Sequence, residues 1–488
     1  MLPALIQRPG QIAASRPRER GITLLLVAVA MFGIITMAGL SIDLGTLYQA
    51  SAEAQRAADA GALAAARVLS ASGMTGDPAN SSSTWAATCT NATQIAQAVA
   101  GQNNVGGAPP SSVTVVFSAS DGTDCSAVTA TAFGVNPMVT VKVTQSSLPT
   151  YFSRIWGRSG HSASASATAE AFNPSGSSNY GSGSTVPVQP RCVKPWIVAN
   201  YDPLHPAPTG TAPNTYCTDP KGANPCDSLI SSIDGTITHG GILGSGIIGE
   251  TFWLVADCLY NTPNCQLRDA PPQANTTKSK HPHAEDPPDV EYLPGQTSFT
   301  SVAVSTGSTC SNVTGNYAQA IAGCDQNTKY QCGVQKLNNV DLTENPSPND
   351  TPNGVQCLIH QQGNGGNGQD ILVFNTTSTP PVPAYPFQIQ VGSRNPLIGA
   401  GVGTTDTITS STSIISLPIY DSSMQTFTAG INQVTIIGFL QVFINSVDNF
   451  GNVNVTVMNI SGCGNAVPSG TAALQGTSPV PVRLITPQ

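Results

Sequence analysis

The hydrophobic pattern of this chain is dominated by one uncharged stretch near its start. Residues 22–42 read ITLLLVAVAMFGIITMAGLSI and hold no charged side chain. At about 1.5 Å of rise per residue, a helix of this length measures roughly 30 Å, which matches the hydrocarbon core of a bilayer. The pattern therefore predicts a membrane-spanning helix.

The alternative interpretation of this stretch is a cleaved signal sequence. The apolar core of a signal sequence is only about 7–15 residues long, and a small-x-small cleavage site follows it. Here the next residues, SIDLGTLYQA, continue the helical pattern instead. We therefore expect the chain to keep this segment as its anchor.

The helix is expected to continue outside the membrane over residues 43–71. This segment contains no proline and is rich in alanine, the strongest helix former. Small residues recur along one of its faces, at Ala50, Ala54, Ala57, Gly61 and Ala64. Either this face packs on the chain's own exported domain, or it packs on another helix of the same kind, as small-xxx-small surfaces do in membranes. The sequence supports both interpretations equally.

A small α+β domain is predicted over residues 72–172. Gly and Pro break the long helix at 72–83, and a second, alanine-rich helix is expected at 84–104. The hydrophobic period then changes to two, which is typical of strands, and a short helical turn is expected at 148–157. The expected strands cover residues 111–119, 125–133, 138–145 and 161–172.

A Gly/Ser/Pro-rich linker at 173–190 is the clearest domain boundary. Residues 191–488 show almost no helical periodicity, and their short apolar runs predict strands separated by Gly and Pro. The polar stretch 261–300 is expected to be an exposed loop. The predicted fold class is therefore α+β with a majority of β: one transmembrane helix extended outward, a small antiparallel sheet, and a large all-β region of sandwich-like architecture.

Charge restricts the possible partners and sets the topology. Charged residues make up 9% of the chain, against roughly 25% in an average soluble domain, and the formal net charge is −8. No basic stripe is available to neutralise phosphates, which argues against nucleic-acid binding. The tail 1–21 holds four arginines and one glutamate. Because Lys and Arg mark the cytoplasmic side of a first helix, we expect this tail in the cytoplasm and the bulk of the chain outside it.

The cysteines indicate disulfides. All 12 follow the membrane segment, and an even number in an exported region is typical of a disulfide framework. No C-x-x-C or Cys/His spacing of a zinc site occurs. The pairs that are close enough in sequence to close small loops are Cys217 with Cys226, Cys258 with Cys265, and Cys324 with Cys332. A disulfide between Cys89 and Cys125 would cross-link the first exported domain.

A family resemblance rests on the first 70 residues. After the apolar run come GLSIDLGTLYQASAEAQRAADAGALAAARVL, with motif residues Gly39, Asp43, Gly45, Tyr48, Gln55, Ala57, Asp59, Gly61 and Leu63. This spacing resembles the N-terminal module of the Tad (tight adherence, Flp-type pilus) assembly proteins of the TadG-like family. The resemblance implies a bacterial inner-membrane protein with one anchor, and the helix followed by a small sheet at 72–172 is similar to a pilin-like architecture.

The polar motif residues are expected to act through contacts. Asp43 stands where the helix leaves the bilayer, so we expect its carboxylate to be solvated at the interface, and Tyr48 is placed for an interfacial aromatic anchor. Gln55 and Asp59 are four residues apart, a spacing that favours a helix-stabilising hydrogen bond. We expect both to contact a partner or water.

Patterns for catalysis or ligand binding are few. Residues 244–249 match G-x-G-x-x-G but lack a βαβ context, so no dinucleotide site is expected. The stretch 281–291, rich in His and acids, is interrupted by prolines and predicts a solvated loop. Residues 421–425 fit the D-x-S-x-S metal motif of a von Willebrand A-type domain except at Gln425, and strand-like sequence follows, so no such site is expected. Glu250 and Asp257 are the only acids to test for hydrolysis, and a structural role is expected for both.

The sequence therefore predicts a protein without catalytic, cofactor or metal sites. We expect a membrane-anchored, non-enzymatic component of a Tad/Flp-type pilus assembly or secretion system. Its expected partners are other Tad pilus-assembly or pilin-like membrane proteins, and the membrane itself. The alternative is a membrane-anchored cell-surface adhesin or carbohydrate-binding module that serves no pilus.

Overall fold

The structure is a computed structural model, and the statements below concern the residues that it describes. They are residues 19–76, 82–119, 136–153, 157, 160–173, 189–206, 226–238, 246–256, 289–333, 337–342, 349–363, 366–377, 381–421, 431–448, 451–463 and 478–485. Several expectations therefore lie outside the described residues: most of the tail, the strand at 125–133, and most of the linker at 173–190 and of the loop at 261–300. The expectation of an exposed loop is wrong for residues 289–294, which form a strand with Val290, Tyr292 and Leu293 buried in the core.

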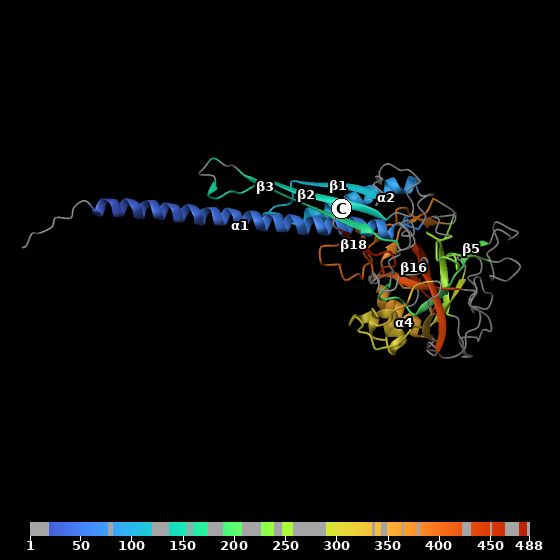
Figure 1. The fold of residues 1–488 in the computed structure, drawn as a ribbon. Coiled ribbons are helices and arrows are strands. Elements are labelled where there is room, and N and C mark those ends of the chain that lie inside the picture. The colour runs from blue at the N-terminus through green and yellow to red at the C-terminus, as the bar shows by residue number, and fades with distance from the viewer. Residues whose placement is uncertain are drawn as a thin grey trace, which may run out of the picture. The chain divides into compact units, whose positions relative to one another are not determined.

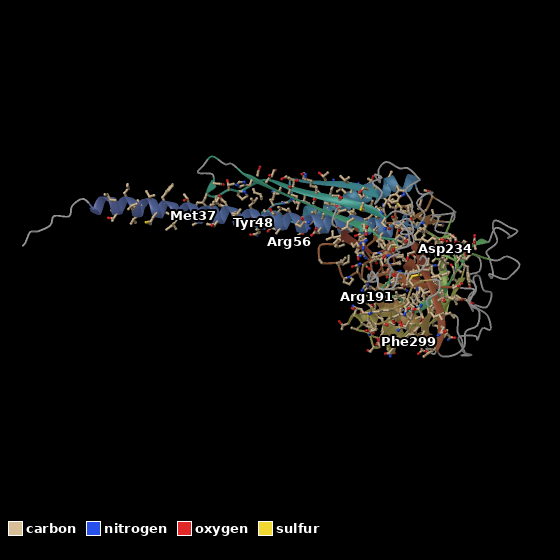
Figure 2. All side chains as sticks on the ribbon, in the orientation of Figure 1. Met37, Tyr48, Arg56, Arg191, Asp234 and Phe299 are labelled. Carbon is tan, nitrogen blue, oxygen red and sulfur yellow. A yellow bond between two sulfur atoms is a disulfide. The ribbon has the colours of Figure 1, made fainter. Side chains whose placement is uncertain are left out.

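Helix α1 runs without a break over Glu19–Ala71, as the sequence predicts. Its 53 residues give a length of about 80 Å. Among the described helices it is the one long and apolar enough to cross a membrane. Side chains of the span point outward, and Met37 is labelled in Figure 2 as an example. The hydroxyls of Thr36 and Ser41 donate to helix carbonyls at 2.8–2.9 Å, so the span carries its polar groups already paired.

Contacts divide the chain into two compact units, which are described separately. The first comprises Met1–Ala57, Gly101–Val113 and Val143–Ala165. The second comprises Ala58–Ala100, Thr114–Lys142 and Ser166–Gln488. The predicted domain boundaries follow the chain order instead, and they stay a prediction.

Helix α2 (Ser82–Gln102) and a four-stranded sheet follow α1 along the chain (Figure 1). The strand order is β1 (Ser112–Ala119), β2 (Pro137–Leu148), β3 (His161–Ala171) and β18 (Val482–Ile485). This confirms the second helix and the expected strands at 111–119, 138–145 and 161–172. The fourth strand comes from the far end of the sequence, where Val482 pairs antiparallel with Ala171 and Ile485 with Thr168.

The large β region closes a sheet upon itself. Strand β15 pairs in parallel with β4 on one side and antiparallel with β16 on the other, so β15, β4, β8, β7, β17 and β16 form a ring. Strand β9 attaches to the start of the long strand β16. The bounds are β4 Trp196–Ala199, β7 Thr251–Ala256, β8 Asp289–Pro294, β9 Leu337–Asp341, β15 Ile414–Tyr420, β16 Ile431–Val447 and β17 Val453–Gly462. The β prediction is confirmed, and a closed sheet replaces the expected sandwich.

Short strands form three further small sheets outside this ring. They are β5 Asp202–Pro206 with β6 Cys226–Asp227, β11 Phe374–Asn375 with β12 Val382–Pro383, and β10 Ile371–Leu372 with β13 Ile389–Gln390 and β14 Thr407–Ile408. The main core contains buried aliphatic residues of β15, β16 and β17 and the rings of Trp196 and Tyr292. Strand β16 is buried on both faces over most of its length, which explains why its sequence is a nearly continuous apolar run.

Two helices interrupt the β region where the sequence shows little helical periodicity. They are α3 (Asn316–Ala322) and α4 (Asp350–Ile359), and a single 3₁₀ turn, Ser308–Cys310, precedes them. Both were missed because glycines flank α3 and because α4 contains Pro352 and Gly354. Gly354 has a packing role: a Cβ there would lie 2.9 Å from Ile321 Cβ and 3.0 Å from the carbonyl of Ala318. The glycine thus allows the close approach of the two helices.

Between described residues, three disulfides join distant parts of the β region, which confirms the prediction of disulfides. They are Cys192–Cys324, Cys310–Cys357 and Cys332–Cys463. Cys89 is disulfide-bonded as well, and none of the described cysteines is free. The suggested pairing of Cys324 with Cys332 is wrong, because folding places each beside a partner about 130 residues away. The other suggested pairs include cysteines outside the described residues.

Lys194 is buried beside the first of these disulfides. Its ammonium donates to the carbonyls of Ile321 at 2.7 Å and Gly323 at 2.6 Å, at the end of α3. Burial lowers the pKa of Lys194 to about 7, against the opposing attraction of Asp325. The side chain therefore caps the C-terminal carbonyl groups of α3. The desolvation of its amine makes this burial energetically unfavourable when the amine is charged.

We expect the stability of the protein to rise between pH 7 and pH 9. In the unfolded chain Lys194 keeps its proton up to about pH 10.4, whereas the folded protein releases it near pH 7. The unfolded state then binds more protons, so the free energy of unfolding increases by up to about 1.4 kcal/mol per pH unit. Urea unfolding of the full chain at pH 7, 8 and 9 measures this slope. The Lys194→Met variant is the control, and an equal slope in both proteins would contradict the prediction.

Candidate functional site

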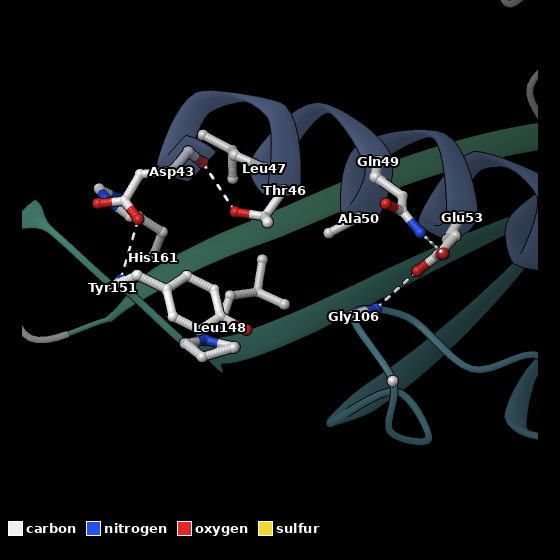
Figure 3. A pocket seen from close by; sticks show the side chains of 12 residues that line it. Asp43, Thr46, Leu47, Gln49, Ala50, Glu53, Gly106, Leu148, Tyr151 and His161 are labelled. Carbon is white, nitrogen blue, oxygen red and sulfur yellow. Dashed lines mark hydrogen bonds between the residues drawn. The ribbon is translucent and has the colours of Figure 1, made fainter. Parts of the chain in front are cut away.

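The first feature of the site is a carboxylate that holds a distant turn. Asp43 follows directly on the predicted span, and its two oxygens accept backbone hydrogen bonds from residues 151–153. The amide of Tyr151 lies 2.9 Å from Oδ1, that of Phe152 3.1 Å from Oδ2, and that of Ser153 2.6 Å from Oδ2. Figure 3 shows Asp43 reaching across to Tyr151. We call residues 149–153 the exit turn.

This geometry corrects the expectation that Asp43 is solvated, because only 6% of the residue is exposed. Burial by itself raises the pKa of the Asp43 carboxyl, but the hydrogen bonds from Ser153, Tyr151 and Phe152 outweigh it and lower the pKa below its ordinary value. The carboxylate thus stays ionised and binds the turn through charge-assisted hydrogen bonds. The described part of the exit turn is irregular rather than α-helical, and residues 154–156 lie outside the described structure.

Gly39 makes the second contact between α1 and the exit turn. A Cβ at this position would lie 2.7 Å from Cγ of the Phe152 ring and 2.9 Å from its Cβ. These atoms are fixed close to the backbone, so a larger residue would displace the turn. Gly39 is therefore a close-approach glycine, whose motif role is to let an aromatic ring lie against the helix.

A cavity of about 150 Å³ extends from the exit turn along α1. Asp43 and Tyr151 line one end, and Glu53 with Gly106 lines the other (Figure 3). Glu53 Oε2 accepts from the amide of Gly106 at 2.7 Å, and Oε1 accepts from Gln49 at 3.0 Å. The Gly106 hydrogen bond is the main cause of a lowered pKa at Glu53. Gly106 itself has φ +62° and lies against Leu148, so it accepts no side chain there.

The chemistry of this site is structural. Both carboxylates are engaged by backbone amides, so they hold two loops against α1. Within the described stretches no group of three His, Cys, Asp or Glu residues could hold a metal ion. The expectations that the protein uses no metal and catalyses no reaction stay predictions.

The small-residue face of the helix is buried by the chain itself. Ala50, Ala54 and Ala57 are almost completely buried. A Cβ at Gly61 would lie 3.2 Å from Ala100 Cβ and 3.3 Å from Val141 Cγ1. Of the two interpretations that the sequence left open, the structure therefore favours packing of this face on the chain's own residues.

The segment that carries these contacts is similar to a known protein family. Residues 21–68 match the family of putative Flp pilus-assembly TadE/G-like proteins. The match covers nearly all of α1 and none of the β strands. No curated protein and no solved structure matches the chain. We call residues 21–68 the Tad-like segment.

The remaining motif residues of the Tad-like segment face outward or lie at the edge of the packed face. A Cβ at Gly45 would meet no atom within 4 Å, and Tyr48 is 69% exposed. Gln55 is exposed, whereas Asp59 and Leu63 are half-buried. The predicted Gln55–Asp59 hydrogen bond and the interfacial role of Tyr48 stay predictions. The motif thus combines residues that are buried against the chain itself with residues that are exposed on the surface of α1.

The described residues among the other catalytic and metal-binding candidates from the sequence do not form a site. Glu250 is buried in the β region, and its amide and carbonyl groups hydrogen-bond within the turn and to Val457. Asp421 accepts a hydrogen bond from Ser232 at 2.9 Å, while Ser423 and Gln425 lie outside the described residues. Asp257, residues 244–245 and the histidines of 281–291 also lie outside them.

The sequence missed the partner of Asp43, because about 110 residues separate it from the exit turn. The signal that was available is weak: an acid at the end of an apolar span is costly unless it is paired or solvated. That signal indicates a role for Asp43 but not which segment it binds.

We expect Asp43→Asn to loosen the exit turn. An amide side chain offers one neutral acceptor oxygen in place of two charged ones, so the backbone amides of 151–153 lose their strongest partner. Hydrogen exchange of these three amides should accelerate by roughly an order of magnitude. Glu53→Gln is the matched control, because it changes the Gly106 contact and leaves Asp43 intact. Unchanged exchange at Ser153 in Asp43→Asn would contradict the prediction.

Proposed function

We propose that the protein is a non-enzymatic, membrane-anchored component of a Tad/Flp-type pilus assembly or secretion system. The observation that carries the proposal is the match of residues 21–68 to Flp pilus-assembly TadE/G-like proteins. The single apolar helix supports anchoring by one span. The arginines of the tail favour an N-terminus in the cytoplasm, with the β region outside the bacterial inner membrane.

The exposed side of the Tad-like segment is the surface that we propose for helix–helix packing. Gly45, Tyr48, Ala52 and Gln55 follow one another at steps of three and four, so they lie on one face of α1. All four are exposed, and the buried residues Ala50, Ala54 and Ala57 lie on the other side of the helix. We call these four residues the outer face. Its spacing suits a like helix of a neighbouring pilus-assembly protein.

The properties of the β region support a role in contacting other proteins outside the membrane. Disulfides and a closed strand ring stiffen it, and few of its side chains are charged. A surface rich in hydroxyl and amide groups suits contacts with pilus subunits or other envelope components. A glycan-binding assay of the full chain distinguishes the two functions, because the adhesin alternative predicts glycan binding and the pilus role does not.

Cysteine cross-linking in membranes tests the outer face. None of the described cysteines is free, so a new one is distinguishable. We expect Ala52→Cys to form intermolecular cross-links on mild oxidation several-fold more than Gln49→Cys, an exposed position beside the outer face. Both positions lie on the same helix within one turn and face different directions, and Glu53 keeps its hydrogen bond from Gly106 when Gln49 is replaced. Equal cross-linking would argue against the outer face as a packing surface.

Deletion of the gene tests the pilus role itself. We expect loss or reduction of surface pili, with restoration by the wild-type chain. Normal pilus output, or a genome without a Tad secretion ATPase and prepilin peptidase, would refute the role and leave the adhesin alternative.

A further inference from the structure

The exit turn lies beside the last turn of the predicted span. Gly39 belongs to the uncharged run 22–42, and the ring of Phe152 is in contact with it. Asp43, one helical turn further along, receives the amides of Tyr151, Phe152 and Ser153. Two contacts a turn apart therefore fix the exit turn along the last turn of the predicted span.

We propose that the exit turn is a second membrane-contacting element, which inserts its aromatic side into the lipid interface beside α1. The proposal rests on the membrane anchor of the proposed function and adds a partner to it, the lipid surface. The anchor alone would hold the chain through one helix. The exit turn adds a non-helical element at the same level of the bilayer.

The hydrogen bonding of the turn suits this location. Irregular backbone at the edge of a bilayer is tolerated only where its polar groups are satisfied within the protein, since lipid offers no partners. Asp43 satisfies three consecutive amide groups of the turn at once. The same carboxylate is itself shielded, because those amides occupy both of its oxygens. Burying unpaired amides or an unpaired carboxylate at the interface would be unfavourable. Because Asp43 and the backbone amides of the exit turn hydrogen-bond to each other, neither group is left unpaired.

The side chains presented there have the chemistry of an interfacial anchor. Tyr151 is 58% exposed. Tyrosine is enriched where membranes meet water, because its ring enters the apolar region and its hydroxyl stays in the headgroup layer. Leu44, half-exposed on α1 next to Asp43, adds apolar surface at the same level. A lipid surface is therefore the occupant that this patch fits.

Lipid quenching of a site-specific fluorophore tests the proposal. The full chain, reconstituted in vesicles, carries one new cysteine labelled with an environment-sensitive dye, and lipids brominated along their acyl chains act as quenchers. The test variant is Tyr151→Cys. Ile35→Cys, an exposed position in the span, is the positive control, and Ala52→Cys, nine residues beyond Asp43 on the same helix, is the negative control.

We expect quenching at position 151 to reach about half of that at position 35 or more, as for a residue at the headgroup level. Position 52 should show little. If position 35 is quenched and position 151 resembles position 52, the anchor stands and the lipid contact of the exit turn is refuted. A buried, unquenched dye at position 151 would show that a protein covers the turn and would equally overturn the proposal. Absence of quenching at position 35 would show that α1 does not span the membrane, which would refute both the membrane-anchored function and the lipid contact of the exit turn.

Discussion

Replacing both Cys332 and Cys463 by alanine is expected to lower the free energy of unfolding by about 5 kcal/mol. The disulfide joins residues 131 positions apart, so its loss releases a large loop in the unfolded state. It also ties the segment before β9 to the end of β17, and both cysteines are buried. A loss of this size approaches the total stability of many domains, and we expect the variant to unfold at physiological temperature. Urea unfolding of the full chain in detergent, followed by tryptophan fluorescence, measures the change.

The Cys310–Cys357 pair provides the matched control for this measurement. It closes a loop of 47 residues, so its removal should cost about 1 kcal/mol less. Alkylation before and after reduction verifies the starting state, because a disulfide framework leaves few thiols reactive before reduction. An unchanged unfolding midpoint in the Cys332/Cys463 variant would show that the ring of strands holds without this link.

The second large effect is expected from Gly61→Leu. A Cβ at this position already lies 3.2 Å from the carbonyl of Ala96 and from Ala100 Cβ, so a leucine side chain has no room. Overpacking of this kind typically costs about 1–3 kcal/mol, and the position of Ala96 on the α2 backbone puts the cost at the upper end. We expect a lower thermal unfolding temperature, separation of α1 from α2, and loss of pilus output, while membrane insertion continues.

Gly45→Leu separates packing within the chain from packing between chains. No atom lies within 4 Å of a Cβ at Gly45, and leucine is the better helix former by roughly 0.8 kcal/mol. We expect the fold to be as stable as the wild type or slightly more so, and helix–helix association to be impaired. If Gly45→Leu assembles normally and Gly61→Leu does not, the Tad-like segment acts by holding its own domain together. Normal pilus output from Gly61→Leu would contradict the account of Gly61.

The sequence predicted those parts of the fold that depend on local patterns. Alanine content and the absence of proline predicted α1 to within a few residues of Glu19–Ala71. Alternation predicted β2 and β3. In each case the residues that determine the element belong to it, so no knowledge of distant contacts is needed.

Long-range pairings could not be predicted in this way. The parallel pairing of β15 with β4, which closes the ring of strands, and the disulfide between Cys192 and Cys324 join residues with no common local signal. Helix α4 is stable because Gly354 packs against Ile321, a tertiary contact that overrides the poor helix propensity of Gly and Pro. The same holds at the site. Asp43 is prominent in the sequence, but its partner is decided by the path of the chain some 110 residues later.

The strand pairing between β18 and β3 has a consequence for biosynthesis. The edge of β3 receives its neighbour from residues made about 310 positions later, so a ribosome adding roughly 5–20 residues per second leaves that edge open for tens of seconds. An open edge is a template for wrong pairing, and Arg483, which pairs with Glu170, sits on the strand that ends this exposure. A prematurely terminated polypeptide therefore presents an unfinished early sheet to the cell's proteases. The first sheet can therefore be completed only after nearly the whole chain has been translated.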